Sequence, residues 1–122
     1  MHRGTALRTP LLVNGIYGII AGLLLFFPSL GAAVFAYQVK DVATVSGWGV
    51  SVVTIGLLAA AAASDVEKYG GLAWLFAFGL LFNATDLSYF WIVGLYTARN
   101  VLMPIIIDVG LAAWIWYAQP KR

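Results

Sequence analysis

Four apolar stretches, each about 20 residues long, occupy most of this chain of 122 residues. An α-helix rises about 1.5 Å per residue, so each stretch is long enough to cross a hydrocarbon core about 30 Å thick. The stretches cover residues 10–27, 43–63, 71–93 and 98–117. Transmembrane β-strands would appear as shorter segments of alternating polarity, which the sequence lacks. The pattern therefore predicts an all-α membrane protein built as a four-transmembrane-helix bundle.

The composition excludes a soluble fold. Hydrophobic residues make up 62% of the chain and charged residues 10%, whereas soluble domains have about 45–50% and about 25%. A soluble domain of this size would have to expose too much of that apolar surface to water. The chain has no cysteine and a single histidine, His2, near its N-terminus. We therefore expect one membrane domain over residues 1–122, with no metal site and no cofactor.

The segment between the first two stretches, residues 29–44, is less regular. Its apolar centre is too short to span a bilayer, so we expect a short interfacial or re-entrant segment between the first and second helices. The first stretch, which Pro28 ends, also fits a secretory signal peptide with a cleavage site at Val34-Phe35-Ala36. We expect it to be retained as a transmembrane helix.

The distribution of basic residues predicts an orientation. Four spans place both termini on one side of the membrane. That side carries Arg3, Arg8, Lys68, Lys121 and Arg122, and the other side carries Lys40 and Arg99. The positive-inside rule then predicts a multi-pass protein of the cell membrane, the inner membrane of a bacterium, with both termini in the cytoplasm. No basic cluster is longer than two residues, so we expect no nucleic-acid partner.

Small residues recur at helical spacing in three of the spans, where they permit close helix packing. The pattern consists of Gly18 with Gly22, Gly47 with Ser51 and Thr54, and Ala73 with Ala77. We expect these positions to pack mainly within one chain, with a homo-oligomer face as the alternative. The surrounding partners would be membrane lipids or partner membrane subunits.

Two acidic residues lie inside predicted spans, Asp86 in the third and Asp108 in the fourth. A charged side chain at the bilayer centre costs about 2.5–3.5 kcal/mol and usually faces the bundle interior. Arg99, at the start of the fourth span, is expected at the depth of Asp86 and is predicted to contact it directly or through water. We take Asp86, Asp108 and Arg99 as candidate catalytic residues. The alternative for Asp108 is a structural one, with hydrogen bonds to Asn14, Ser51 or Thr54.

Further polar residues accompany these charges and predict one polar cavity inside the bundle. Asn83, Asp86 and Tyr89 occupy positions i, i+3 and i+6 of the third span, and Asn100, Pro104 and Asp108 occupy positions i, i+4 and i+8 of the fourth. Asn14 lies among apolar residues of the first span. The residues expected to line the cavity are Asn14, Asn83, Tyr89 and Asn100.

The layout resembles small bacterial four-helix membrane proteins of the DoxX-like type. The likeness rests on the basic start before LLVNGIYGIIAGLLLFFP, the small-residue second span, and a last helix of the form P-x-x-x-D-x-x-L-x-x-W from Pro104 to Trp114. It covers most of the chain and implies the four-helix fold. It implies no particular activity.

Three functions fit these features. The first is an accessory or assembly subunit of a larger membrane complex, because the loops are minimal and no catalytic set is complete. The second is a small membrane-embedded acid–base enzyme acting on an apolar lipid or isoprenoid-like substrate, such as an isomerase, cyclase or epoxide hydrolase. The third is a proton or ion pathway through Asp86 and Asp108. The sequence does not distinguish among them.

Overall fold

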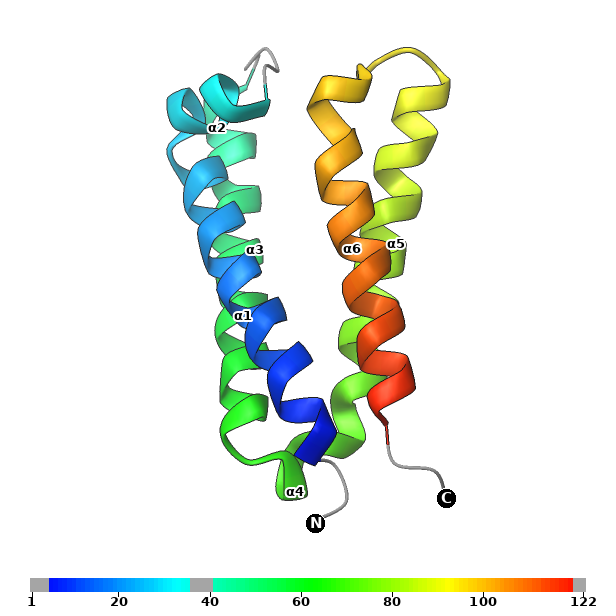
Figure 1. Cartoon of the computed structure of the whole chain (residues 1–122). Helices are drawn as coiled ribbons and strands as arrows, with labels where there is room; N and C mark the ends of the chain where they lie inside the picture. The colour runs from blue at the N-terminus through cyan, green and yellow to red at the C-terminus, as the bar shows by residue number, and fades with distance from the viewer. Residues whose placement is uncertain (1–4, 36–40, 120–122) are drawn as a thin grey trace.

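The fold consists of four long helices and three short helical pieces, and we describe it from a computed structural model in which residues 5–35 and 41–119 are placed (Figure 1). The elements are α1 (Thr5–Phe26), α2 (Pro28–Phe35), α3 (Val42–Ser64), α4 (Val66–Tyr69), the 3-10 helix η1 (Gly70–Leu72), α5 (Ala73–Ile92) and α6 (Ala98–Ala118). Within these ranges there is no strand. Four helical segments are long and apolar enough to cross a membrane, at residues 6–26, 42–64, 66–92 and 98–118. The predicted all-α four-helix membrane bundle is therefore confirmed.

Local signals explain where the helices begin. The Asp41 carboxylate accepts hydrogen bonds from the Thr44 hydroxyl at 2.7 Å and the Thr44 amide at 3.1 Å, which caps α3. These bonds, the hydroxyl first, lower the pKa of Asp41 below its ordinary value. Asp65 caps α4 by accepting from the Lys68 amide at 3.2 Å. Between α5 and α6, Gly94 has a φ of +88°, a conformation that a side chain disfavours.

Glycines lie at the closest approaches of α1 and α3, the helix pair with the most extensive contact in the bundle. A methyl group added to Gly56 would lie 2.8 Å from the carbonyl oxygen of Gly15 and 2.8 Å from the amide nitrogen of Ile19. Gly49, about two helical turns before Gly56 on α3, approaches Gly22 and Phe26 in the same way. The two backbones can approach this closely only because no side chain separates them.

The predicted contact face of the second span was wrong, although that of the first was right. A side chain at Gly47 would meet nothing within 4 Å, and Ser51 and Thr54 are exposed. The two hydroxyls instead bond to carbonyls of their own helix, Ser51 to Gly47 at 3.4 Å and Thr54 to Val50 at 2.9 Å. The face in contact is the one that carries Gly49 and Gly56. At about 100° per residue these two positions lie about 160–180° around the helix from Gly47.

The second helix pair is α5 with α6. On α5 the buried residues recur at intervals of three and four, namely Ala73, Ala77, Leu80, Ala84 and Leu87. On α6 they are Val101, Asp108, Leu111, Ala112 and Ile115. Such spacing produces a continuous stripe on each helix. The prediction that Ala73 and Ala77 pack closely within the chain agrees with their burial.

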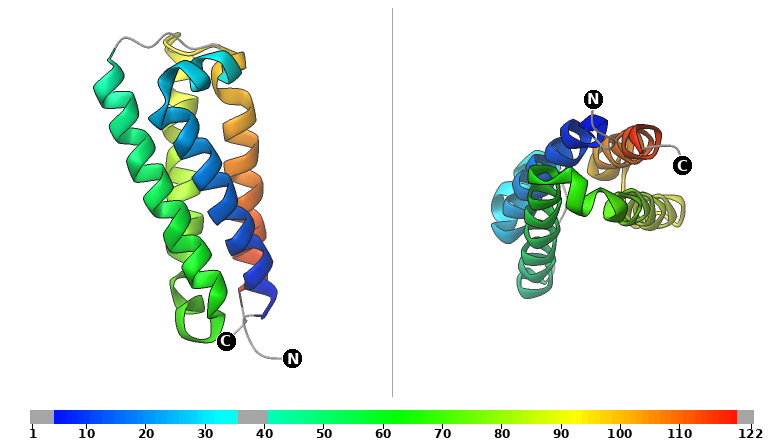
Figure 2. Two further views of the ribbon diagram at one scale, coloured as in Figure 1. Left: turned by 90° about the vertical axis from the view of Figure 1, so that its left-hand side faces the viewer. Right: turned by 90° about the horizontal axis from the view of Figure 1, so that it is seen from below.

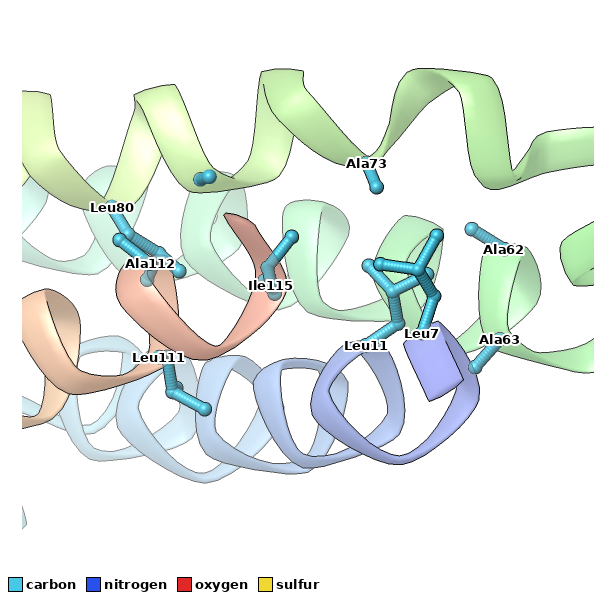
Figure 3. Close-up of a cluster of buried hydrophobic side chains, with 10 residues drawn as sticks. Leu7, Leu11, Ala62, Ala63, Ala73, Leu80, Leu111, Ala112 and Ile115 are labelled. Atoms are coloured by element: carbon cyan, nitrogen blue, oxygen red, sulfur yellow. The ribbon is translucent and has the colours of Figure 1, made fainter. Parts of the chain in front are cut away.

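Contact between the two helix pairs comes mainly from α1 against α6. Figure 2 shows α1 and α6 adjacent, while α3 and α5 diverge from them, when the bundle is seen from below. At the end where α4 crosses over, Leu7 and Leu11 are fully buried beside Ala63, Ala73 and Ile115 (Figure 3). The start of α1 and the end of α6 lie at this same end of the bundle (Figure 1). Of the basic residues used to predict the orientation, Arg3, Lys40, Lys121 and Arg122 lie outside the described residues.

The irregular segment between the first two long helices contains the short helix α2, as expected for part of residues 29–44; residues 36–40 lie outside the described ranges. α2 is held to the start of α6 by one polar contact. The side-chain amide of Asn100 donates to the carbonyl oxygen of Phe35 at 2.7 Å. The same side chain accepts from the Thr97 amide at 2.9 Å and so caps α6. Asn100 therefore joins α6 to α2.

Replacing Asn100 with alanine should loosen α2 without unfolding the bundle. The change removes one donor from the Phe35 carbonyl and one acceptor from the cap of α6, at a cost of about 1 kcal/mol per bond. We expect faster amide hydrogen exchange over residues 28–35. Thr85→Ala is the control, because the Thr85 hydroxyl bonds only to its own helix, at Leu81. Equal exchange of α2 in the wild type and the Asn100 variant would contradict this role.

Candidate functional site

A large apolar cavity lies between the two helix pairs, and we call it the α3–α5 pocket. Its volume is about 1020 Å³, at the upper end of the range of about 300–1,000 Å³ typical of ligand sites. All four long helices line it. Apolar side chains make up most of the wall, among them Leu25, Val52, Ile55, Leu75, Phe76, Leu80, Leu87 and Val101.

The pocket is partly open, and its open side faces away from α1 and α6. The lining residues that remain exposed lie mostly on α3 and α5, for example Ile55, Leu58 and Leu75. Those on α1 and α6 are largely buried, such as Gly18 and Val101. α3 and α5 hardly touch each other. In a membrane this opening would face lipid rather than water.

We call the side of the pocket next to α1 and α6, opposite its opening, the inner wall. Asp108 lies there, near the middle of α6, with only 1% of its surface exposed. Its carboxylate accepts a hydrogen bond of 2.7 Å from the side-chain amide of Asn83 on α5. The hydroxyl of Tyr17 on α1 interacts with the same carboxylate. Three helices thus supply one polar cluster, which we call the Asp108 cluster: Asp108, Asn83 and Tyr17.

Asn14 adds a second buried polar group to the same pocket. It lies one turn before Tyr17 on α1, lines the pocket and is 5% exposed. Within the described part of the chain its side-chain amide forms no hydrogen bond. Buried amides are usually satisfied, so this group is available to a molecule inside the pocket.

The predicted partners of Asp108 were therefore wrong. Ser51 and Thr54 bond to their own helix, and no hydrogen bond joins Asn14 to Asp108 among the described residues. The observed donor is Asn83 of the facing helix α5, and the Tyr17 hydroxyl of α1 interacts with the same carboxylate. The cavity itself was predicted, with Asn14, Asn83 and Asn100 in its wall, and all three line it together with Asp108.

Three predicted site residues lie outside the pocket. Tyr89 is 53% exposed and does not line it. Asp86 and Arg99 are exposed as well, and no direct ion pair joins them in the residues that the structure describes. Asp86 instead lies near Tyr96, whose pKa rises above its ordinary value because of burial first and the Asp86 charge second. The pocket therefore holds Asp108 in its wall without Asp86 or Arg99.

The aromatic side chains of the pocket wall were not predicted from the sequence. Tyr17, Trp48, Phe76 and Tyr96 all contribute to the wall, although spacing alone marked none of them as site residues. The one available signal was that Tyr17 follows Asn14 by three residues and so shares its helix face.

Neither family models nor curated proteins nor solved structures match the chain.

Proposed function

We propose that this multi-pass membrane protein binds an apolar, lipid-derived molecule in the α3–α5 pocket. The single observation that carries the proposal is the distribution of polarity within the wall. The lining is apolar except for a few polar groups, and the buried ones, Asp108 and Asn14, belong to the inner wall. An apolar pocket with a small number of placed polar groups is the usual form of a site that binds an apolar ligand and fixes its orientation.

The open side between α3 and α5 supports a ligand that arrives through the bilayer. An apolar chain can enter there without crossing water, and the polar group of the ligand then reaches the Asp108 cluster. The proposal places the protein in the cell membrane, the inner membrane of a bacterium, with both termini in the cytoplasm. The support for that orientation is the excess of basic residues on one side of the chain.

An acid–base enzyme of the type expected from two aspartates has less support. Asp108 is the one carboxylate in the described wall of the pocket, whereas Asp86 and Arg99 lie outside it. General acid–base chemistry on an apolar substrate needs groups within hydrogen-bond reach of the reacting atoms. Because Asp86 lies outside the pocket that holds Asp108, a proton or ion pathway through both aspartates also has less support.

An accessory or assembly subunit is the second candidate function. The observation that favours it is how little α3 and α5 touch each other, which leaves the pocket-facing sides of both helices partly exposed. A transmembrane helix of a partner subunit would cover these surfaces. We also propose that the chain is related to DoxX-like proteins. The support for this relationship is the P-x-x-x-D-x-x-L-x-x-W pattern of α6.

Two matched glycine substitutions test ligand binding. Gly79 lines the pocket and Gly110 does not, and a side chain at either position meets nothing within 4 Å. Gly79→Phe therefore has open space at its Cβ and should occupy part of the pocket with its ring, and Gly110→Phe is the control. With hexadecan-1-ol as the probe in a non-ionic detergent, native mass spectrometry should show one molecule bound per wild-type chain.

We expect Gly110→Phe to bind the probe like the wild type and Gly79→Phe to bind it at least about tenfold more weakly, a difference of about 1.4 kcal/mol. Equal binding by the two variants would place the ligand elsewhere. If the wild type binds no long-chain probe and instead co-purifies with a second membrane protein in fixed ratio, the accessory-subunit function replaces ligand binding.

A further inference from the structure

Resting on the proposed ligand site, we propose that the α3–α5 pocket selects amphiphiles whose polar group is a protonated amine and rejects those with an anionic head. The inference concerns the chemistry at the inner wall, where Asp108, Asn83, Tyr17 and Asn14 lie. It assigns the pocket to long-chain amines.

The first reason is charge. Asp108 is the only charged side chain in the described wall of the pocket. None of the described basic residues lies in the wall: Arg8 and Arg99 are exposed outside the pocket. The Lys68 ammonium lies 5.3 Å from the ring centre of Tyr69, a wall residue at the α4 end, on α4 rather than on the helices that carry Asp108, Asn83 and Tyr17. A carboxylate at the middle of a membrane helix without a cationic partner is unfavourable. A bound ammonium group would supply that partner.

The second reason is the balance of donors and acceptors. A carboxylate offers about four lone-pair sites, and Asn83 occupies one of them with its hydrogen bond of 2.7 Å, while the Tyr17 hydroxyl lies near the same group. Acceptor capacity therefore remains at Asp108. An ammonium group brings three N–H donors and no acceptor, so one can bond to Asp108 and another to the side-chain carbonyl of Asn14.

The third reason is the aromatic part of the wall. Tyr17, Trp48 and Phe76 line the same cavity, and aromatic faces attract ammonium groups at desolvated sites. A phosphate or a fatty-acid carboxylate would instead meet the Asp108 carboxylate with no cation between them, which costs free energy as a like-charge contact in a low dielectric. Anionic phospholipid heads are therefore excluded from the inner wall.

Three probes with the same chain and different heads test this selectivity: hexadecan-1-amine, hexadecan-1-ol and hexadecanoic acid. Affinities are measured at pH 7 for the whole protein in a non-ionic detergent, by native mass spectrometry and by the shift of the thermal unfolding midpoint. The wild type should bind the amine about tenfold to a hundredfold more tightly than the alcohol, or about 1.4–2.8 kcal/mol. The acid should bind more weakly than the alcohol.

The variant Asp108→Asn keeps the shape of the side chain and removes its charge, so the preference for the amine over the alcohol should fall to within about threefold, or about 0.6 kcal/mol. Asp86→Asn is the matched control, because it removes one aspartate outside the pocket. This variant should prefer the amine over the alcohol to the same extent as the wild type. Asn14→Leu provides a second variant that breaks no hydrogen bond among the described residues. It should weaken amine binding at least about threefold.

The outcomes separate the two proposals. If the wild type binds amine and alcohol equally, or binds the acid as tightly as the amine, the selectivity is wrong while the ligand site stands. If Asp108→Asn or Asn14→Leu leaves amine binding unchanged, the assignment to the inner wall is also wrong. If the wild type binds none of the three probes, ligand binding itself is overturned.

Discussion

Replacing Gly56 with leucine should separate α1 from α3 and lower the free energy of unfolding by about 3 kcal/mol, the upper end of ordinary overpacking in a core. The effect is large because the new side chain would meet backbone atoms of Gly15, Gly18 and Ile19, which cannot rotate away as a side chain can. The measurement is equilibrium unfolding in mixed micelles of a non-ionic detergent and sodium dodecyl sulfate.

The control for this change lies on the same helix. Gly47→Leu adds the same side chain at a position where nothing lies within 4 Å, so its unfolding midpoint should stay close to that of the wild type. If the two variants are equally stable, the close contact between α1 and α3 does not hold the bundle together.

Replacing Asn83 with leucine should be the next most damaging change, with a loss of about 1–3 kcal/mol in the free energy of unfolding. The substitution removes the donor that lies 2.7 Å from the Asp108 carboxylate and leaves that buried group with fewer partners. The measurement is again equilibrium unfolding in mixed micelles, with Thr85→Val as the control on the same helix.

A double variant separates the hydrogen bond from simple packing. In Asn83→Leu/Asp108→Leu both polar partners are gone and no buried carboxylate remains, so most of the lost stability should return. A double variant that is as unstable as the sum of the two single variants would show that the Asn83–Asp108 bond makes no net contribution.

The long helices could be predicted from hydropathy because length and apolar content alone determine whether a segment can span a bilayer. The predicted second span, residues 43–63, differs from α3 by one residue at each end. The contact face of α3 could not be predicted in the same way. Gly47 with Ser51 and Gly49 with Gly56 are both small-residue patterns, and the choice between them depends on which side faces α1.

The buried polar residues of the site could be predicted from the sequence, but the contacts between helices could not. Asp108, Asn83, Asn14 and Asn100 are polar in apolar surroundings, and each lies in the wall of the pocket. Tyr89 follows Asn83 by six residues, which at about 100° per residue turns it about 120° away from Asn83 around the helix. The interaction of Tyr17 with Asp108 joins α1 to α6, and such a contact depends on how the two helix pairs meet.

The way in which the two helix pairs meet has a mechanical consequence. Because α1 and α6 supply most of the contact between the pairs, their line of contact can act as a hinge. A small rotation about this line changes the distance between α3 and α5 and disturbs few other contacts. The Asn83–Asp108 bond lies within the α5–α6 pair and would be kept, whereas the contact of Asp108 with Tyr17 on α1 crosses the hinge and would change as the entrance widens or narrows.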